Sequence, residues 1–322
     1  MKADTKTDDR GELVSVMEPL LIGGGSRHRP ALTDLALDLT QKSAGFRRSL
    51  PPSLLASLAD LVRSMNCYYS NLIEGHDTHP VDIERALRND YSQDARKRNL
   101  QIEAKAHIAV QKWIDGGGLK GGVSIQPEGI CEIHRRFCEL LPEDLLWVED
   151  PATHEKVRLV PGELRKRDVQ VGNHVAISPG ALPHFLVRFA QVYGSVGKTE
   201  TIISTAAAHH RLLWIHPFMD GNGRVARLMS HAMMLDTLDT GAVWSVARGL
   251  ARNVNMPSSQ TRFEPPLSTL PGLRPVPLCD ISCFKRFKQN SSFLSLWLNG
   301  MTECLNSVYL SYLIAGHLAF LL

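Results

Sequence analysis

Most of the first three quarters of the chain places apolar residues at helical spacing. In the stretch 53–73, Leu54, Leu58, Leu61 and Met65 return every three or four residues, which is the period of a helix with one buried face. The same spacing predicts further helices, at residues 32–41, 81–89, 101–114, 127–141, 183–196, 200–215 and 221–238. The pattern therefore predicts a mostly α fold.

The period changes between residues 156 and 177. There the stretch VQVGNHVAI (169–177) alternates β-branched residues around Gly172 and Asn173, a pair that suits the tight turn of a hairpin. We therefore expect one small β-hairpin beside the helices.

The two ends of the chain differ from this body. Residues 1–50 look like a loose N-terminal arm that carries only the short helix at 32–41. After about residue 256, prolines interrupt any long element, and the stretch 293–322 is apolar with Glu303 as its single charge. Asn306 and His317 lie in the part that comes close to bilayer length, so we expect a packed terminal helix rather than a tail anchor, and no clear membrane span.

Composition excludes several classes of protein. The chain has 322 residues, 43% hydrophobic and 21% charged, with a net charge of +3, which is typical of a globular protein. The absence of a long basic run gives no indication of nucleic acid as a partner. The polar start lacks the apolar segment of a secretory signal, which predicts the cytoplasm. The six cysteines do not form the paired spacing of a zinc site, and we expect reduced thiols.

The stretch Trp214 to Leu228 carries candidate chemistry for binding phosphate. After the helix at 200–215 ends before Pro217, Asp220-Gly221-Asn222-Gly223 leads into the next helix. Glycines and asparagine let successive N–H groups point into one concavity, and a helix N-terminus favours an anion there. Arg224 and Arg227 share a face of the new helix, where two guanidinium groups repel each other unless an anion lies between them.

Two further residues of this stretch suggest a reaction. His216 offers a side chain that titrates near neutral pH, as suits a general base. Asp220 is a carboxylate at an anion site, which is explained if it holds Mg²⁺ against a phosphate. Each piece alone is typical of an ordinary turn or a solvated helix face, but their combined order favours a phosphate site.

The string HPFMDGNGRVAR resembles the signature of the Fic (Fic/Doc) family, HxFx(D/E)GNGRxxR, and the resemblance extends over about residues 51–255. It implies a Fic-type helical bundle in which the hairpin is a flap that binds the target. His216 would deprotonate the target hydroxyl, Asp220 would hold Mg²⁺, and Phe218 would face the core. The implied nucleotide-binding residues are Gly221, Asn222, Gly223, Arg224, Val225, Ala226, Arg227 and Asn253. A branch of the family that phosphorylates its target has lysine where this chain has Gly223, so Gly223 favours nucleotidyl transfer.

A second segment, Ser70 to Gly75, resembles the inhibitory motif of that family, (S/T)xxxE(G/N). Ser70 and Glu74 are four residues apart and share a helix face, and Gly75 supplies a helix stop. The resemblance implies that Glu74 pairs with Arg227 and displaces the γ-phosphate of ATP. Because the motif precedes the signature, the chain resembles members that inhibit themselves through an N-terminal helix.

Other residues near the signature invite a chemical role but favour a plainer one. His209 and His210 are adjacent on a helix and point to different faces, so we expect buried structural histidines rather than a metal site. Asn173 and His174 belong to the expected flap, and we assign them no catalysis.

The sequence therefore predicts an N-terminal arm (1–50), a helical region with the inhibitory motif (51–100), a catalytic domain (101–255) and a divergent tail (256–322). The resemblance implies a protein adenylyltransferase that uses ATP and Mg²⁺ and modifies a hydroxyl side chain of a target protein. The chain itself is one candidate target, and a homo-oligomer is one candidate assembly. Three alternatives stay open. They are transfer from UTP, transfer of a phosphoryl group, and an adaptor that binds a nucleotide without turnover.

Overall fold

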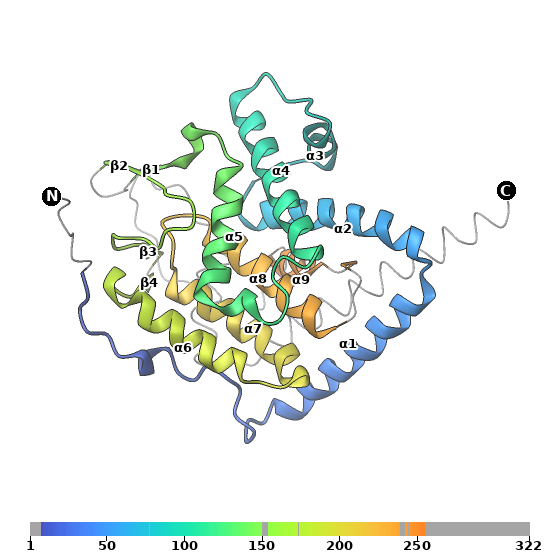
Figure 1. Ribbon diagram of the computed structural model, residues 1–322, viewed down its shortest axis with the longest axis vertical. Helices are drawn as coiled ribbons and strands as arrows, with labels where there is room; N and C mark the ends of the chain where they lie inside the picture. Colours follow the sequence, from blue (N-terminus) through green and yellow to red (C-terminus); the bar gives the residue numbers. More distant parts are fainter. Residues whose placement is uncertain are drawn as a thin grey trace.

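A computed structural model describes residues 8–254, with the exceptions of 77, 150–153, 173, 239–241 and 244. Helices make up most of this part of the chain, and the strands are short (Figure 1). The α-helices are α1 (Arg29–Ser49), α2 (Pro52–Ile73), α3 (Pro80–Leu87), α4 (Ala95–Asp115), α5 (Pro127–Glu139), α6 (Leu182–Gly194), α7 (Lys198–Ile215), α8 (Asn222–Thr237) and α9 (Val246–Val254). The 3₁₀ turns are η1 (Val14–Met17), η2 (Val123–Ile125), η3 (Glu143–Leu146) and η4 (Pro179–Ala181).

The main core lies between α5, α6, α7 and α8. Phe185 and Phe189 of α6 are fully buried there, as are Ile133 of α5 and Met229 of α8. Helix α7 is buried around most of its circumference, and small residues such as Ala207 allow its neighbours to approach closely. The mostly α fold predicted from apolar spacing is confirmed, and each helix expected between residues 32 and 238 is present.

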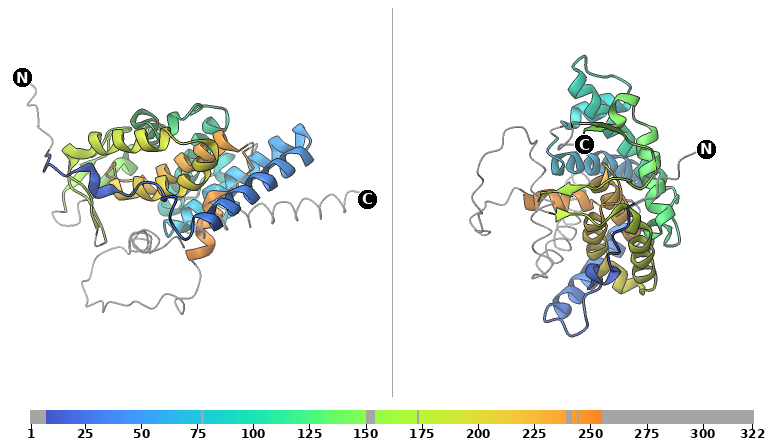
Figure 2. Two further views of the ribbon diagram at one scale, coloured as in Figure 1. Left: turned by 90° about the horizontal axis from the view of Figure 1, so that it is seen from below. Right: turned by 90° about the vertical axis from the view of Figure 1, so that its left-hand side faces the viewer.

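A second core joins α1, α2 and α9. Leu39 and Phe46 of α1 pack with Val62 of α2 and Val246 of α9. Helix α1 runs along one side of the molecule, and α2 begins where α1 ends and turns back across it (Figure 1 and Figure 2). Helix α1 is longer than the short helix expected at 32–41, because its apolar face continues as far as Phe46.

The N-terminal segment 8–22 is not a loose arm, contrary to the expectation. It runs along the side of α6 (Figure 1), and Met17 and Leu20 are almost wholly buried in the main core. Tyr193 donates a hydrogen bond to the carbonyl of Leu20 at 2.8 Å, and Arg211 donates one to the carbonyl of Pro19 at 2.8 Å. The segment reads as a loop in sequence because its buried residues follow no regular period.

Two small hairpins flank the helices. The expected hairpin is confirmed: β3 (Gln170–Val171) pairs antiparallel with β4 (His174–Val175). The other joins β1 (Trp147–Glu149) to β2 (Lys156–Arg158), also antiparallel. The sequence analysis missed this second pair, whose strands have only three residues each, too few to establish a period of two.

One expectation lies wholly outside the described residues. It concerns the tail from 256, with its apolar end and the Cys279 and Cys283 pair. Among helices in the described ranges, none has the length and apolar character needed to cross a membrane. The division at residues 100 and 101 stays a prediction.

The burial of the N-terminal segment gives a stability prediction. Leu20→Ala should lower the free energy of unfolding by about 2–5 kcal/mol, since it deletes methyl groups from a filled core. Val16→Ala is the matched control, because Val16 is 57% exposed in the same segment, and it should change that free energy by less than about 0.5 kcal/mol. Denaturant unfolding measures both, and equal small effects would mean that the segment is detached in solution.

Candidate active site

The turn between α7 and α8 begins with His216 in the left-handed region of backbone conformation. Its φ and ψ are 52° and 62°, and its N–H still donates to the carbonyl of Leu212 at 3.0 Å. Pro217 follows and disfavours a further helical residue before it. The helix therefore ends at Ile215 and leaves the His216 side chain at the rim of the turn, half-buried.

The hydrogen bond of the His216 ring fixes its tautomer. Nδ1 lies 3.3 Å from the carbonyl oxygen of Leu213, and because a carbonyl only accepts, Nδ1 carries the proton. The other ring nitrogen, Nε2, then has a lone pair that can accept a proton. Burial is the main cause that lowers the pKa of His216, to about 4. The expectation of titration near neutral pH is wrong, because desolvation disfavours the imidazolium.

Asn222 holds the shape of the turn with its side chain. Its Oδ1 accepts a hydrogen bond from the N–H of Phe218, and its Nδ2 donates to the carbonyl of Phe218, both at 2.9 Å. Phe218 is fully buried, as expected, and its ring stacks on His134 with centroids 3.9 Å apart. His134 in turn accepts a hydrogen bond from the N–H of Gly162 at 2.9 Å, so α5 supports the turn from below.

Helix α8 starts at this turn with unpaired backbone donors. Gly221 takes a positive φ of 81° as the residue before the helix, and the first-turn N–H groups that follow can bind an anion. The N–H of Val225 already donates to the carbonyl of Gly221 at 3.0 Å, and the side chains of Val225 and Ala226 are buried in the core. These two expected nucleotide-binding residues therefore support the turn from its apolar side.

Two residues at the end of α2 form hydrogen bonds with Arg227. We call Ser70, Glu74 and Arg227 the Arg227 clamp. Nε of Arg227 donates to Ser70 Oγ at 2.8 Å, and Nη2 forms a charged hydrogen bond with Glu74 Oε1. Burial alone would raise the pKa of Glu74, but the guanidinium groups of Arg227 and Arg224 outweigh it and hold that pKa below its usual range. Ser70 and Glu74 of the expected inhibitory motif therefore form hydrogen bonds with Arg227 of the signature.

The end of α2 sets the direction of Glu74. Gly75 has a φ of 78°, its N–H donates to the carbonyl of Leu72, and the N–H of His76 donates to the carbonyl of Asn71 at 2.8 Å. These crossed bonds form the Schellman ending that favours glycine. Because this ending stops the helix immediately after Glu74, the carboxylate projects toward α8.

Gly223 lies directly beneath Glu74. A Cβ at this position would overlap Glu74 Oε1 and come within 3.1 Å of Arg227 Nη1. The glycine therefore lets the Glu74 carboxylate occupy the space over the first turn of α8. That space is where an anion bound to the first-turn amides would lie.

The sequence analysis missed the partner of the other arginine. Arg224 Nη2 lies 3.0 Å from Glu103 Oε2 of α4, and both side chains are largely buried. The guanidinium of Arg224 also lies over the ring of Phe137, 4.8 Å from its centroid. Glu103 follows no motif in this chain, so only the packing of α4 against α8 reveals the pair.

Asp220 is exposed at the mouth of the turn. Within the described ranges, no group of three or more His, Cys, Asp or Glu side chains is arranged to hold a metal ion. A single exposed carboxylate next to a phosphate site still fits Mg²⁺, which commonly takes one or two carboxylates and completes its shell with phosphate oxygens and water.

The remaining candidates lie around this centre. His209 and His210 are buried in α7, as expected, and His209 Nδ1 lies 3.0 Å from Ser230 Oγ. His174 of the hairpin places Nε2 2.9 Å from the carbonyl of Trp214. Asn173 lies outside the described residues. Asn253 belongs to α9, but its side chain is outside the described part of the structure.

Comparison with known families identifies the central part of the chain. Residues 124–234, which run from η2 to α8 and include the whole turn, match the model of the Fic/DOC family. Over these residues the chain is similar to the Fic/DOC family. The Arg227 clamp joins this matched region to α2, which lies outside it.

Curated relatives match a larger part of the chain. The protein adenylyltransferases Fic of Drosophila erecta and Drosophila yakuba are 28% and 29% identical to it over 170 residues. The match covers 52% of this chain and 31% of each relative. The chain thus spans about a third of the length of these curated relatives.

Solved structures establish the Fic fold. A Fic family protein from Desulfovibrio desulfuricans is similar with a TM-score of 0.61 at 14% identity, over 88% of this chain and 75% of its own. Fic-1 from C. elegans is similar with a TM-score of 0.52 at 17% identity, over 88% of this chain and 76% of its own.

The environment of His216 at the end of α7 gives a titration prediction. Its ring should stay neutral down to a pKa of about 4, with protonation only as the pH falls through that value. NMR of the ring carbons measures this, and the loss of the signals in His216→Ala provides their assignment. A titration midpoint near the ordinary histidine value would contradict the buried, Leu213-bound ring.

Proposed function

We propose that the protein is an adenylyltransferase that moves AMP from ATP onto a Ser, Thr or Tyr hydroxyl of a target protein and is inhibited by its own Glu74. The observation that carries this proposal is the neutral His216, with Nε2 able to accept a proton, beside a helix N-terminus and two arginines that suit phosphate. The names of the Drosophila relatives support the same reaction.

The geometry supports an in-line transfer. The target hydroxyl would give its proton to His216 Nε2 while its oxygen attacks the α-phosphorus. The bond from that phosphorus to the oxygen bridging to the β-phosphate breaks, and pyrophosphate leaves. The amides at the start of α8 and the guanidinium of Arg224 would orient the phosphates and stabilise their charge. Asp220 would hold Mg²⁺, which supplies further neutralisation of phosphate charge.

The Arg227 clamp explains how such an enzyme would be restrained. The Glu74 carboxylate and the γ-phosphate of ATP are both anions that suit the guanidinium of Arg227. While the Glu74 carboxylate is bound to this guanidinium above Gly223, it places a negative charge where the terminal phosphate of ATP would lie. ATP would then bind with its α-phosphate out of line for attack.

The alternative reactions have less support. A lysine in place of Gly223, as in the phosphorylating branch, would overlap Glu74, whereas the glycine accommodates it. An adaptor that only binds nucleotide has no need of a histidine held as a base. Nothing in the turn selects between ATP and UTP, so competition between them belongs to the test.

The wider setting is proposed on the same basis. A protein substrate would lie along the β3–β4 hairpin, since strand edges bind extended segments through the backbone. If the purified protein attaches the α-label to itself, the chain is one of its own targets. A homo-oligomer is a separate proposal, which light scattering would test. Cys67, Cys131 and Cys138 are free thiols, which supports the cytoplasm as the compartment.

The decisive experiment uses ATP labelled on the α- or the γ-phosphate. Glu74→Gln should raise covalent incorporation of the α-label roughly 10- to 100-fold, because the variant loses a charged hydrogen bond worth about 1.5–3 kcal/mol. The second change His216→Ala, added to Glu74→Gln, should abolish incorporation. The matched control is Glu84→Gln, a substitution of an exposed glutamate on α3, which should leave incorporation at the wild-type level.

Each other outcome has a distinct meaning. Incorporation of the γ-label would replace AMP transfer with phosphorylation. Stronger competition by UTP than by unlabelled ATP would change the donor. ATP binding without incorporation of either label in Glu74→Gln would support the adaptor and reject the transferase.

A further inference from the structure

Arg165 lies between the two hairpins, and within the described part of the chain the hydrogen bonds of its buried guanidinium do not reach a carboxylate. Only 2% of its surface is exposed, and its guanidinium donates to backbone carbonyls instead. Nε donates to the carbonyl of His216 at 2.8 Å, Nη2 to that of Ile177 at 2.5 Å, and Nη1 to that of Arg167 at 2.9 Å. Burial lowers the pKa of Arg165, to about 10, so it stays charged at pH 7.

Some of the carbonyls that Arg165 contacts lie at the end of α7 and in the turn that follows it. The last carbonyls of a helix have no partner within it and form the negative end of the helix dipole. Nη2 of Arg165 also reaches the carbonyl of Ile215 at 3.5 Å, and its backbone N–H donates to the carbonyl of Pro217 at 2.9 Å. One residue thus contacts three consecutive carbonyls around His216.

This contact explains why His216 keeps its backbone conformation. The left-handed region is unfavourable for a residue other than glycine, and such a conformation persists only when its surroundings impose it. Here Leu212 accepts the N–H of His216 and Arg165 binds its carbonyl. The direction of the His216 ring follows from these two backbone contacts.

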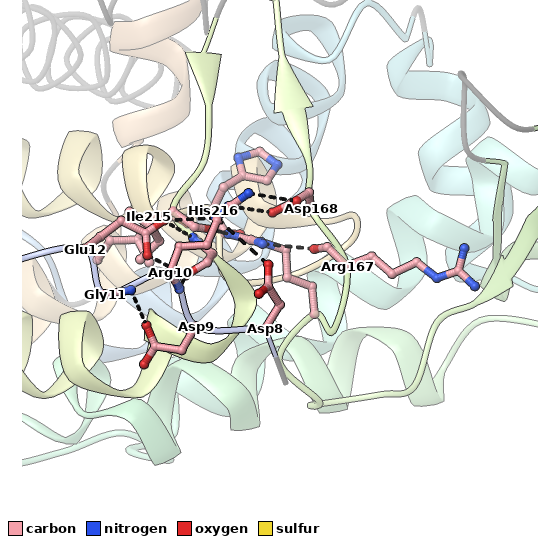
Figure 3. A network of polar contacts seen from close by, with 12 residues as sticks. Asp8, Asp9, Arg10, Gly11, Glu12, Arg167, Asp168, Ile215 and His216 are labelled. Atoms are coloured by element: carbon pink, nitrogen blue, oxygen red, sulfur yellow. Dashed lines mark hydrogen bonds and ion pairs between the residues drawn. The ribbon is translucent and has the colours of Figure 1, made fainter. Parts of the chain in front are cut away.

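The N-terminal segment supports Arg165 from outside. Ser178, next to Ile177, donates from its N–H to Glu12 at 2.8 Å and from its hydroxyl at 2.5 Å. Arg10 forms two hydrogen bonds with Asp168, at 2.8 and 3.1 Å. Figure 3 shows the labelled Arg10 and Asp168 joined by these bonds close to His216. The section around Asp168, which follows Arg165, and the section around Ser178, which follows the acceptor Ile177, are therefore both bonded to segment 8–12.

We propose that Arg165 is a positioning residue that holds the His216 base in line, with segment 8–12 as its outer support. This inference rests on the proposed transferase function. Arg165 acts through the backbone of His216, and it makes no contact with the phosphate turn at Gly221–Gly223. Its loss should therefore reduce the chemical step and leave ATP binding intact.

Kinetics in the released Glu74→Gln protein give the first test. Arg165→Lys keeps the charge but cannot donate the forked set of bonds. It should lower kcat for α-label transfer roughly 10- to 100-fold, as expected for a misplaced base, with an unchanged KM for ATP. The control Arg167→Lys changes an arginine two positions along that pairs with Glu155 at the surface, and it should keep full activity. An unchanged kcat in Arg165→Lys, or an equal loss of ATP affinity, would overturn the proposal.

A titration separates this idea from the proposed function. The charges that face His216 are those of Arg165, Asp220 and His174 when protonated, and the positive ones lower its pKa. Arg165→Met should therefore raise the pKa of His216, while Arg165→Lys should leave it nearly unchanged but shift the ring signals of His216. NMR gives this result even if no label is ever transferred, and unaltered signals in both variants would reject the positioning role.

The outer support allows a test that does not disturb the core. Arg10 has an exposed side chain, so Arg10→Ala should fold even if Arg165→Met does not. It should also lower kcat, by a smaller factor than Arg165→Lys does, and again with an unchanged KM for ATP. Full activity of Arg10→Ala would remove segment 8–12 from the proposal, and full activity of both variants would refute it.

Discussion

The buried guanidinium of Arg227 is the group around which the phosphate side of the site is organised. A charge at this depth is tolerated only with close partners, and the structure supplies Ser70 and Glu74 from a helix more than a hundred positions earlier in the chain. This requirement brings the end of α2 against α8. It also explains why position 223 is a glycine, since the Glu74 carboxylate fills the space that a side chain would need.

The other half of the site depends on burial in a different way. Desolvation keeps His216 neutral, and the hydrogen bond from Nδ1 to Leu213 leaves Nε2 as the proton acceptor. Buried helices below the turn, through Phe218 and His134, give it a rigid base. A neutral histidine in a fixed direction is therefore a consequence of core packing as much as of local sequence.

The sequence was informative where a pattern is local. Helical spacing predicted α2 to α8, and the order His216, Asp220, Gly221 to Arg227 predicted the composition of the turn. The segment Ser70 to Gly75 also predicted the contact with Arg227, but only through resemblance to a family. Period and propensity could not reveal Glu103 or Arg165, because each acts on a partner that is distant in the chain. The burial of Met17 and Leu20 was missed for the same reason, since a segment without a period gives no sign of which face it buries.

The two halves of the turn differ in how firmly they are held. His216 is fixed by backbone bonds on both sides, from Leu212 and Arg165, which a ligand cannot displace without unfolding the end of α7. Glu74, by contrast, reaches Arg227 with a single side chain, and the crossed bonds that end α2 do not involve its carboxylate. Rotation of that side chain would release Arg227 while Ser70 and the packing of α2 stay in place. If Glu74 restrains the proposed enzyme, the fold therefore permits control at Arg227 without any change at His216, and the contact between Glu74 and Arg227 can be reversible because it is local.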